Sequence, residues 1–408
     1  MDRNTLLAFF LISLILIFTP KYMEMVSPTP EPNTYEDEEI FTSPENPSPD
    51  VEEVTIQPTR PEKTTPSITN LDDTIIELET PLYIARVSSR SGGTITEFNI
   101  KNYLTTDSSL VNLILPNQSP NLQIQAKDLD GNELNLGSPW ELVSSQPPSI
   151  IKEPFSLEFK KEVFKSRYIY KTLVFNPYGY TIGVDIDLSS IRGDIYRDVL
   201  FGWHGGLAST EKNRVDDRSY FKAYAYMGGE LEELKGKLDK REEKKFSGET
   251  DWLSVRTKYF TSSLIPSSPT DVMKSALVSP GDSLETYDAY FVLDVNSIPA
   301  FTLFLGPLEY ERIKNLGVNL DSIMDFGWAF IRPISKGVLY ALKLMHNHIP
   351  NYGFVLIVFA FLVKLLVYPL TKKSYQSTSA MQAIQPEVNA LREKHKSNPT
   401  KLNQATME

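Results

Sequence analysis

A single lysine inside a long apolar run is the feature that most constrains this chain. The run covers residues 353–370 (GFVLIVFAFLVKLLVYPL), and Lys364 is its only charged residue. An apolar run of this length is typical of a helix that crosses a lipid bilayer. A charged side chain near the centre of such a helix costs roughly 2.5–3.5 kcal/mol on insertion scales, so it usually serves a function. The sequence therefore predicts a membrane-spanning helix with a functional cation.

The position of Lys364 leaves a second interpretation open. At ~1.5 Å per residue it lies ~16 Å from Gly353, near or just past the middle of a ~30 Å hydrocarbon layer. The aliphatic stem of a lysine can also extend to the nearer headgroups and place the ammonium there. Position alone does not show what the ammonium faces, so the functional interpretation is an expectation.

A second apolar run, residues 6–18, begins shortly after the first residue. Residues 1–26 together could form a tilted helix that crosses the membrane. A cleaved signal peptide is the alternative, but no pair of small residues that would mark a cleavage site follows the run. We therefore predict an uncleaved transmembrane signal anchor over residues 1–26.

The charges that follow the second span predict the orientation of the chain. Cytoplasmic segments near a span carry an excess of lysine and arginine. Residues 371–401 show such an excess, because they contain two acidic residues, Glu387 and Glu393, against six basic ones. The basic residues are Lys372, Lys373, Arg392, Lys394, Lys396 and Lys401. Two spans then place the N-terminus in the cytoplasm as well. We expect a multi-pass membrane protein with a large domain exported from the cytoplasm.

Composition divides the exported part into a linker and a folded domain. Residues 27–69 are rich in proline and include the acidic run 36–39, so they bury little and predict a disordered spacer. Residues 70–320 show short alternating patterns separated by turn residues, with candidate hairpins around 91–93, 130–131 and 176–179. Many short strands without interleaved helices indicate a large β-sandwich rather than an α/β fold. The charged run 230–245 is expected to form a solvated loop or an exposed hairpin.

Two further helical patterns flank the second span, which we place at residues 352–371. Before it, residues 326–348 carry apolar side chains at three- and four-residue spacing, with Trp328 and Tyr340 suited to headgroup depth. This pattern predicts an amphipathic helix in the membrane interface. A shorter helix is expected within residues 307–316. After the span, residues 372–408 begin a polar helical segment with a thin apolar face, which suits one arm of a cytoplasmic helical hairpin.

Several classes of function find no support in the sequence. The net charge of −11 argues against a nucleic-acid partner. The chain has no cysteine, and its four histidines do not show zinc-ligand spacing with an acidic partner. His204 lies in a glycine-rich turn, where a structural role is expected. We predict no catalytic residues, no metal and no cofactor.

The C-terminal part of the chain resembles the YidC-type membrane protein insertases of bacteria. The resemblance rests on residues 326–328 (FGW), the amphipathic pattern, residues 351–354 (NYGF) and residues 368–372 (YPLTK), with support from 385–386 (QP) and 402–404 (LNQ). Weaker support comes from residues 90–93 (RSGG), 259–266 and 306–307. The first residues, MDRN, are also similar to those of Gram-negative members.

The resemblance implies a fold and a mechanism. Residues 70–320 would form a periplasmic β-supersandwich, combined with α-helical transmembrane segments. The span would line a polar groove in which Lys364 attracts the exported segment of a new membrane protein, with Tyr368, Pro369 and Thr371 forming the surrounding motif. Partners would be nascent integral membrane proteins, the Sec translocon, the ribosome, the signal-recognition receptor and the lipid bilayer.

The chain departs from the family pattern at two places. The family usually has arginine where this chain has Lys364, and a desolvated lysine can lose its proton whereas arginine keeps its charge. The sequence also ends within a polar helical stretch, where relatives continue with further spans, so we expect a truncated chain. Two other hypotheses remain: a membrane-anchored β-sandwich module that binds periplasmic carbohydrate or envelope material, and a periplasmic sugar-converting enzyme, which lacks a convincing acid–base pair.

Overall fold

The computed structural model describes residues 71–116, 120–272, 274–296, 299–324, 326–327 and 330–394. The signal anchor predicted over residues 1–26 and the linker predicted over residues 27–69 lie outside this part of the chain. So do Trp328, the motif at residues 402–404 and the end of the predicted cytoplasmic segment. The domain boundaries given above therefore stay predictions.

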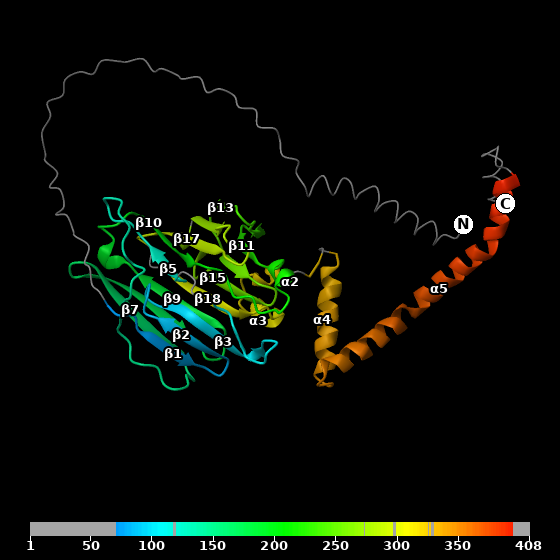
Figure 1. Ribbon diagram of the computed structural model, residues 1–408, viewed down its shortest axis with the longest axis horizontal. Helices are drawn as coiled ribbons and strands as arrows, with labels where there is room; N and C mark the ends of the chain where they lie inside the picture. The colour runs from blue at the N-terminus through cyan, green and yellow to red at the C-terminus, as the bar shows by residue number, and fades with distance from the viewer. Residues whose placement is uncertain are drawn as a thin grey trace, which may run out of the picture. The chain divides into compact units, whose positions relative to one another are not determined.

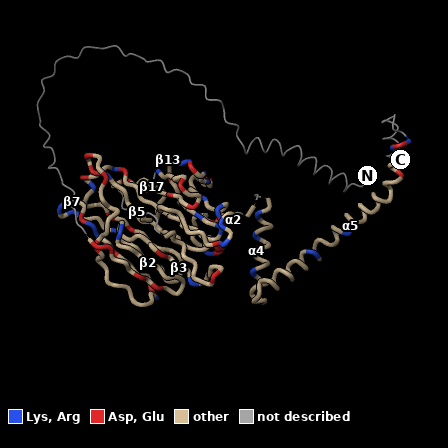
Figure 2. Tube along the Cα trace, in the orientation of Figure 1, with Lys and Arg blue, Asp and Glu red and all other residues tan. Residues whose placement is uncertain are grey.

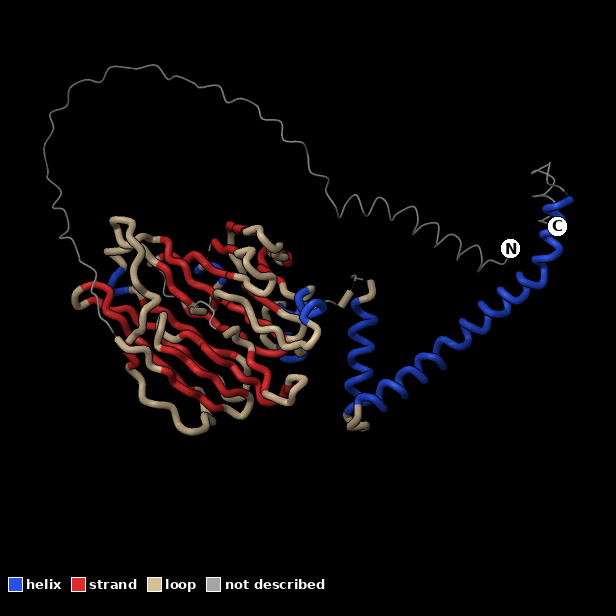
Figure 3. The backbone as a smooth tube through the Cα atoms, in the orientation of Figure 1, coloured by secondary structure: helices blue, strands red, loops and turns tan. Residues whose placement is uncertain are grey.

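The described strands between residues 75 and 307 form three antiparallel β-sheets (Figures 1 and 3). A four-stranded sheet has the order β1-β2-β3-β4. Its strands are β1 (Ile75–Glu79), β2 (Tyr83–Ser88), β3 (Thr94–Leu104) and β4 (Leu110–Asn112).

A nine-stranded sheet has the order β12-β11-β14-β15-β18-β9-β8-β7-β6. Its strands are β6 (Glu141–Leu142), β7 (Phe155–Phe164), β8 (Arg167–Phe175), β9 (Thr181–Asp187), β11 (Lys222–Met227), β12 (Glu230–Leu234), β14 (Trp252–Arg256), β15 (Phe260–Pro266) and β18 (Ala300–Pro307). A five-stranded sheet has the order β13-β16-β17-β10-β5. The strands of this five-stranded sheet are β5 (Gln123–Gln125), β10 (Asp198–Trp203), β13 (Glu242–Ser247), β16 (Lys274–Ser279) and β17 (Asp288–Asp294).

The nine-stranded sheet packs against both smaller sheets through aromatic side chains. Phe301 of β18 lies 4.9 Å from Phe201 of β10 and 5.5 Å from Phe291 of β17, measured between ring centroids. Tyr83 of β2 lies 6.4 Å from Tyr180, and its hydroxyl donates a hydrogen bond to the carbonyl of Asn176. Large aromatic side chains in offset contact contribute strongly to such a core. The predicted combination of a β-rich sandwich domain with helices is confirmed.

Two of the predicted hairpins form as the alternation indicated. β2 pairs with β3 across the turn at residues 91–93, and β8 pairs with β9 across residues 176–180. Gly93 has φ +106°, and a Cβ there would lie 2.6 Å from Cδ1 of Leu173, so both conformation and space require glycine. The third predicted hairpin is reduced to β5 and an isolated bridge between Lys127 and Glu133.

The charged run at residues 230–245 differs from the expected loop or hairpin. It supplies two edge strands, β12 and β13, which belong to different sheets. β12 pairs with β11, and β13 pairs with β16. Edge strands have one unpaired side, and charged residues along them prevent pairing with other chains. The charge pattern therefore fits strands at sheet edges.

Short helices lie between strands or directly after β18, and two longer helices follow them. The short elements are α2 (Arg214–Arg218), α3 (Tyr310–Lys314), η1 (Ser189–Ile191), η2 (Pro269–Asp271) and η3 (Leu320–Ile323). The helix expected within residues 307–316 is α3, and its Ile313 is buried. The amphipathic pattern forms α4 (Arg332–His346), and α5 (Tyr352–Lys394) continues through both Pro369 and Pro386.

Candidate functional site

The first half of α5 contains the apolar run that the sequence analysis singled out. Tyr352–Pro369 is long and apolar enough to cross a membrane, and it is the one such helix in the described part of the chain. Figure 2 shows that charged residues are sparse there, in contrast to the β domain. With a rise of ~1.5 Å per residue, Lys364 lies ~18 Å from Tyr352 and ~8 Å from Pro369.

Polar side chains form a stripe along one face of α5. Tyr368 follows Lys364 by four residues and Thr371 follows it by seven, so each lies within about 40° of Lys364 around the helix axis, on opposite sides of it. Tyr375 and Thr378 continue the same spacing. We call these five residues the polar stripe. Of the four predicted site residues, the helix brings Lys364, Tyr368 and Thr371 together, whereas Pro369 lies roughly 140° away from Lys364.

Two features of the backbone accompany the polar stripe. Pro369 has no N–H group, so the carbonyl of Leu365 lacks its usual helical donor. The hydroxyl of Thr371 donates a hydrogen bond of 3.0 Å to the carbonyl oxygen of Val367. This bond satisfies the Thr371 hydroxyl within the helix, which is how threonine is tolerated in an apolar setting. The stripe therefore places polar groups on α5 without breaking the helix.

Lys364 has apolar, exposed neighbours on its own helix. Phe361 is 64% exposed, Leu365 62% and Leu366 75%. Among the described residues, no carboxylate lies within ion-pair distance of the Lys364 ammonium. The arrangement is that of a cation on an apolar helix whose side chains are free to meet lipid, other helices or a polypeptide.

α4 contacts the residues before it through its cationic side. The ammonium of Lys336 lies 3.6 Å from a carboxylate oxygen of Asp321, and that of Lys343 lies 3.8 Å from Glu311. The hydrogen bond between Lys336 and Tyr310 raises the pKa of the lysine. The structure buries no residue of α4, and Ile334 is 65% exposed. Its apolar side is therefore free, as the prediction of an interfacial helix requires.

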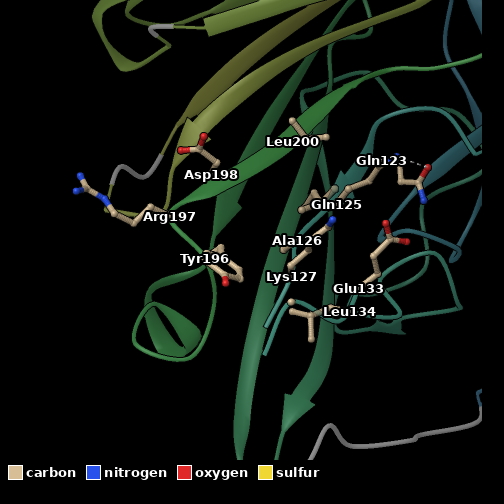
Figure 4. Close-up of a pocket in the computed structure, with 12 residues that line it drawn as sticks. Gln123, Gln125, Ala126, Lys127, Glu133, Leu134, Tyr196, Arg197, Asp198 and Leu200 are labelled. Carbon is tan, nitrogen blue, oxygen red and sulfur yellow. Dashed lines mark hydrogen bonds between the residues drawn. The ribbon is translucent and has the colours of Figure 1, made fainter. Parts of the chain in front are cut away.

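A cavity in the β domain was not predicted from the sequence. It has a volume of about 890 Å³ and is bordered by β5 and by residues 196–200 (Figure 4). We call it the edge pocket. Its polar lining includes Gln123, Gln125, Lys127, Glu133, Tyr196 and Asp198. Arg197 points away from the other labelled side chains and pairs with Asp294 at 2.7 Å. The edge pocket shares no residue with α5.

Histidines and acidic residues do not gather into a metal site in the described part of the chain. His204, for which a structural role was expected, has its Nδ1 atom 3.5 Å from a carboxylate oxygen of Asp288. His346 stacks on Tyr352, with ring centroids 3.7 Å apart, and so joins the end of α4 to the start of α5.

The large antiparallel β domain, the amphipathic helix and the apolar helix with the polar stripe together define a membrane protein that carries a large β domain. The family described as "YidC periplasmic domain" matches residues 75–337, and "60Kd inner membrane protein" matches residues 344–408. The chain belongs to the YidC family of membrane protein insertases. The resemblance seen in the sequence is confirmed, the β domain is the periplasmic domain of this family, and the protein is an inner-membrane protein.

Similar proteins of other bacteria carry the name "Membrane protein insertase YidC". That of Prosthecochloris aestuarii is 32% identical over 419 residues, covering 98% of this chain and 70% of the relative. That of Chlorobium phaeovibrioides is 32% identical over 424 residues, covering 98% and 71%. Among solved structures, the Slr1438 protein from Synechocystis has a TM-score of 0.35 at 13% identity, covering 60% of this chain and 99% of that protein.

Proposed function

We propose that this protein inserts integral membrane proteins and assists their folding, with Lys364 as the cation that attracts the exported segment of the client. The observation that carries the proposal is the position of Lys364. It lies on an exposed face of α5, inside the apolar run, in line with Tyr368 and Thr371. The client would move along this face on its way into the bilayer.

The magnitudes favour a transient attraction. Two unit charges 4 Å apart attract by about 1 kcal/mol in water and about 4 kcal/mol at an effective dielectric constant of 20. Holding a lysine at the centre of a span costs roughly 2.5–3.5 kcal/mol. A client carboxylate near Lys364 would offset that cost while it is close. The net gain is small, so the client can leave again.

The remaining residues of the motif would support this role in different ways. Tyr368 and the residues that continue the stripe present hydroxyl groups on the side of Lys364, which would keep that side hydrated. Pro369 lies on another face, and the carbonyl of Leu365 that it leaves without a helical donor can bind water or a neighbouring helix. The mechanism needs neither a nucleotide nor a metal.

The partners and the topology follow from the family resemblance. The clients would be nascent integral membrane proteins, received directly or from the Sec translocon, with the ribosome and the signal-recognition receptor as further partners. The chain would cross the membrane more than once, with its N-terminus in the cytoplasm. The basic residues after Pro369, beginning with Lys372 and Lys373, support a cytoplasmic end for α5.

Charge substitution in the full-length protein tests the role of Lys364. Two clients are compared that differ only in whether the exported segment carries Asp and Glu or their amides. Lys364→Ala should reduce insertion of the acidic client and leave the neutral client unchanged, whereas Lys364→Arg should keep both. Lys372→Ala, which removes a lysine outside the apolar run, is the matched control. Equal insertion of the acidic client by wild type and Lys364→Ala would remove Lys364 from the mechanism but not the chain from its family.

The edge pocket supports a second candidate function, the binding of carbohydrate or envelope material. Its volume lies within the 300–1,000 Å³ that is usual for ligand sites, and amide, carboxylate and tyrosine groups suit hydroxyl-rich ligands. Deletion of residues 70–300 separates the two functions. Insertion should survive the deletion if the helices perform it, and should be lost if the β domain performs the main task.

A further inference from the structure

The end of the β domain from which the chain leaves for α4 is defined by the strand register. Lys222 pairs with Arg256, and Phe260 pairs with Pro307. The start of β11, the end of β14, the start of β15 and the end of β18 therefore lie at one end of the nine-stranded sheet. From Pro307 the chain continues through α3 and η3 to α4. We call this end of the domain the exit end.

Large apolar side chains are exposed at the exit end. Val215 is 81% exposed, Leu104 62%, Tyr259 48% and Tyr220 38%. Leu104 and Tyr259 line one cavity of about 280 Å³ together with Leu308. The ring of Tyr103, next to Leu104, packs edge-on against Phe260 at 5.6 Å. Exposed apolar residues that gather in this way usually mark a contact with a partner or a membrane.

A lysine connects the aromatic residues to α2. The Lys258 ammonium lies 5.3 Å from the ring centroid of Tyr220 and 5.4 Å from that of Tyr259. It also forms an ion pair of 2.7 Å with Asp216, which is the neighbour of Val215. The hydrogen bond to Asp216 raises the pKa of Lys258, so the lysine stays charged at neutral pH. The exposed side chains of the exit end therefore belong to one surface.

The chemistry of this surface matches the headgroup region of a bilayer. Tyrosine is enriched at membrane interfaces because its ring is apolar and its hydroxyl is polar. Val215 and Leu104 supply apolar side chains that can enter the boundary of the acyl chains. Lys212 and Arg214 are exposed on either side of Asn213, directly before Val215, and can attract lipid phosphates.

The exit end is also the part of the domain that contacts α4. The ion pairs of Asp321 with Lys336 and of Glu311 with Lys343 join α4 to the segments that follow β18. A second cavity, of about 420 Å³, is bordered by Tyr220, Met324 and Arg332, and so lies between the segment that follows α2 and the start of α4. The amphipathic helix α4, whose apolar side is free, therefore contacts the same end of the β domain that exposes apolar side chains.

We propose that the exit end of the β domain rests on the outer leaflet of the inner membrane, with Leu104, Val215 and Tyr259 at headgroup depth and α4 beside them in the interface. The β domain would then contact the bilayer directly, in addition to being linked covalently to α4. The opposite end of the domain, which carries the edge pocket, points into the periplasm.

A leucine at the opposite end of the β domain, Leu129, supplies a matched control for this proposal. Leu129 is 54% exposed, close to the value for Leu104. It follows Asp128, which bridges to Ile195, close to the start of β10 and the end of β17. This is the end at which β18 begins, and the eight residues of β18 span roughly 26 Å. Leu129 should therefore stay in water when Leu104 contacts lipid.

Because the chain has no cysteine, single cysteines can be labelled without other changes. Leu104→Cys, Val215→Cys and Leu129→Cys are each labelled with an environment-sensitive fluorophore in the full chain. The protein is reconstituted into vesicles of phosphatidylethanolamine and phosphatidylglycerol, with and without lipids that carry a spin label near the headgroup. Because all three positions are exposed, the variants should fold, and circular dichroism checks this.

The proposal predicts blue-shifted emission and loss of intensity with spin-labelled lipid at positions 104 and 215, but not at 129. Equal quenching at all three positions, or none at 104 and 215, would overturn it. A signal at 104 and 215 that changes only with the density of the protein would identify a second copy as the occupant instead. A signal that changes only when a client is added would identify the client. The fluorescence at positions 104, 215 and 129 does not depend on Lys364. This test and the insertion test of Lys364→Ala can therefore fail separately.

Discussion

Lys171 on β8 donates a hydrogen bond of 2.6 Å to the carbonyl oxygen of Leu122, and its side chain is completely buried. A second bond, of 3.1 Å, goes to the carbonyl of Ser91. Ser91 and Leu122 both have positive φ, 55° and 51°, which is uncommon for residues other than glycine. One lysine therefore holds two turns of different sheets in an unfavourable conformation. Burial lowers the pKa of Lys171 to about 7, and a neutral amine still has two hydrogens for the two carbonyls.

Lys171→Met should destabilise the β domain by roughly 2–4 kcal/mol, because two buried carbonyl groups lose their partner. The loss should depend on pH. Between pH 7 and 10.5 the unfolded lysine holds a proton that the folded one has released, so the free energy of unfolding rises with pH in this window. The difference in unfolding free energy between wild type and Lys171→Met should therefore grow from pH 7 to pH 9. Denaturant titrations monitored by near-UV circular dichroism measure it, and a constant difference would contradict the buried, deprotonated lysine.

Gly93→Ala should destabilise the domain far more than Gly131→Ala. Both glycines have positive φ, +106° and +89°, so both substitutions strain the backbone. At Gly93 the new Cβ would also lie 2.6 Å from Leu173, whereas nothing lies within 4 Å at Gly131. Strain alone costs on the order of 1–3 kcal/mol. Thermal unfolding of the two variants gives the comparison. Equal losses would show that the contact with Leu173 relaxes at little cost.

Arg256→Lys should loosen the connection between the β domain and α4. The guanidinium of Arg256 donates to the carbonyls of Ile323, at 2.5 Å, and Thr257, at 3.0 Å. A lysine cannot reproduce this planar arrangement, and hydrogen bonds to charged groups contribute about 1.5–3 kcal/mol. Hydrogen exchange over residues 320–324 should become faster. Arg197→Lys is the control, because Arg197 is 75% exposed in its ion pair and such pairs contribute at most about 1 kcal/mol. Unchanged exchange in Arg256→Lys would refute the connection.

Strands with one exposed face could be predicted from the sequence, and strands with two covered faces could not. The hairpin of β8 and β9 alternates between buried and partly exposed residues, which the sequence shows directly. All residues of β14 and β15 are buried, so no alternation exists. Ser254, Thr261 and Ser263 hydrogen-bond to one another inside the domain, which makes these strands look polar. Their hydrogen-bond partners come from neighbouring strands, and a sequence pattern does not show them.

The site could be predicted in part for a similar reason. The spacing of Lys364, Tyr368 and Thr371 places them on one face of any helix, so their grouping required only the prediction of α5. The groups that contact this face of α5 belong to other segments, so the spacing within α5 does not predict them. The burial of Lys171 could not be predicted for the same reason. Its place in an alternating strand does not show that the turns around Ser91 and Leu122 cover it.

The direct test of the central claim is photo-crosslinking from two positions on α5 in the full-length protein, with a stalled client that carries an acidic exported segment. Tyr368 lies one turn from Lys364 on the polar stripe, and Leu366, which is 75% exposed, lies on the opposite face of the helix. A photoreactive amino acid at position 368 should capture the client, and one at position 366 should capture mainly lipid. Capture of lipid alone from both positions would show that the Lys364 face meets the bilayer rather than the client, and would contradict the proposed mechanism.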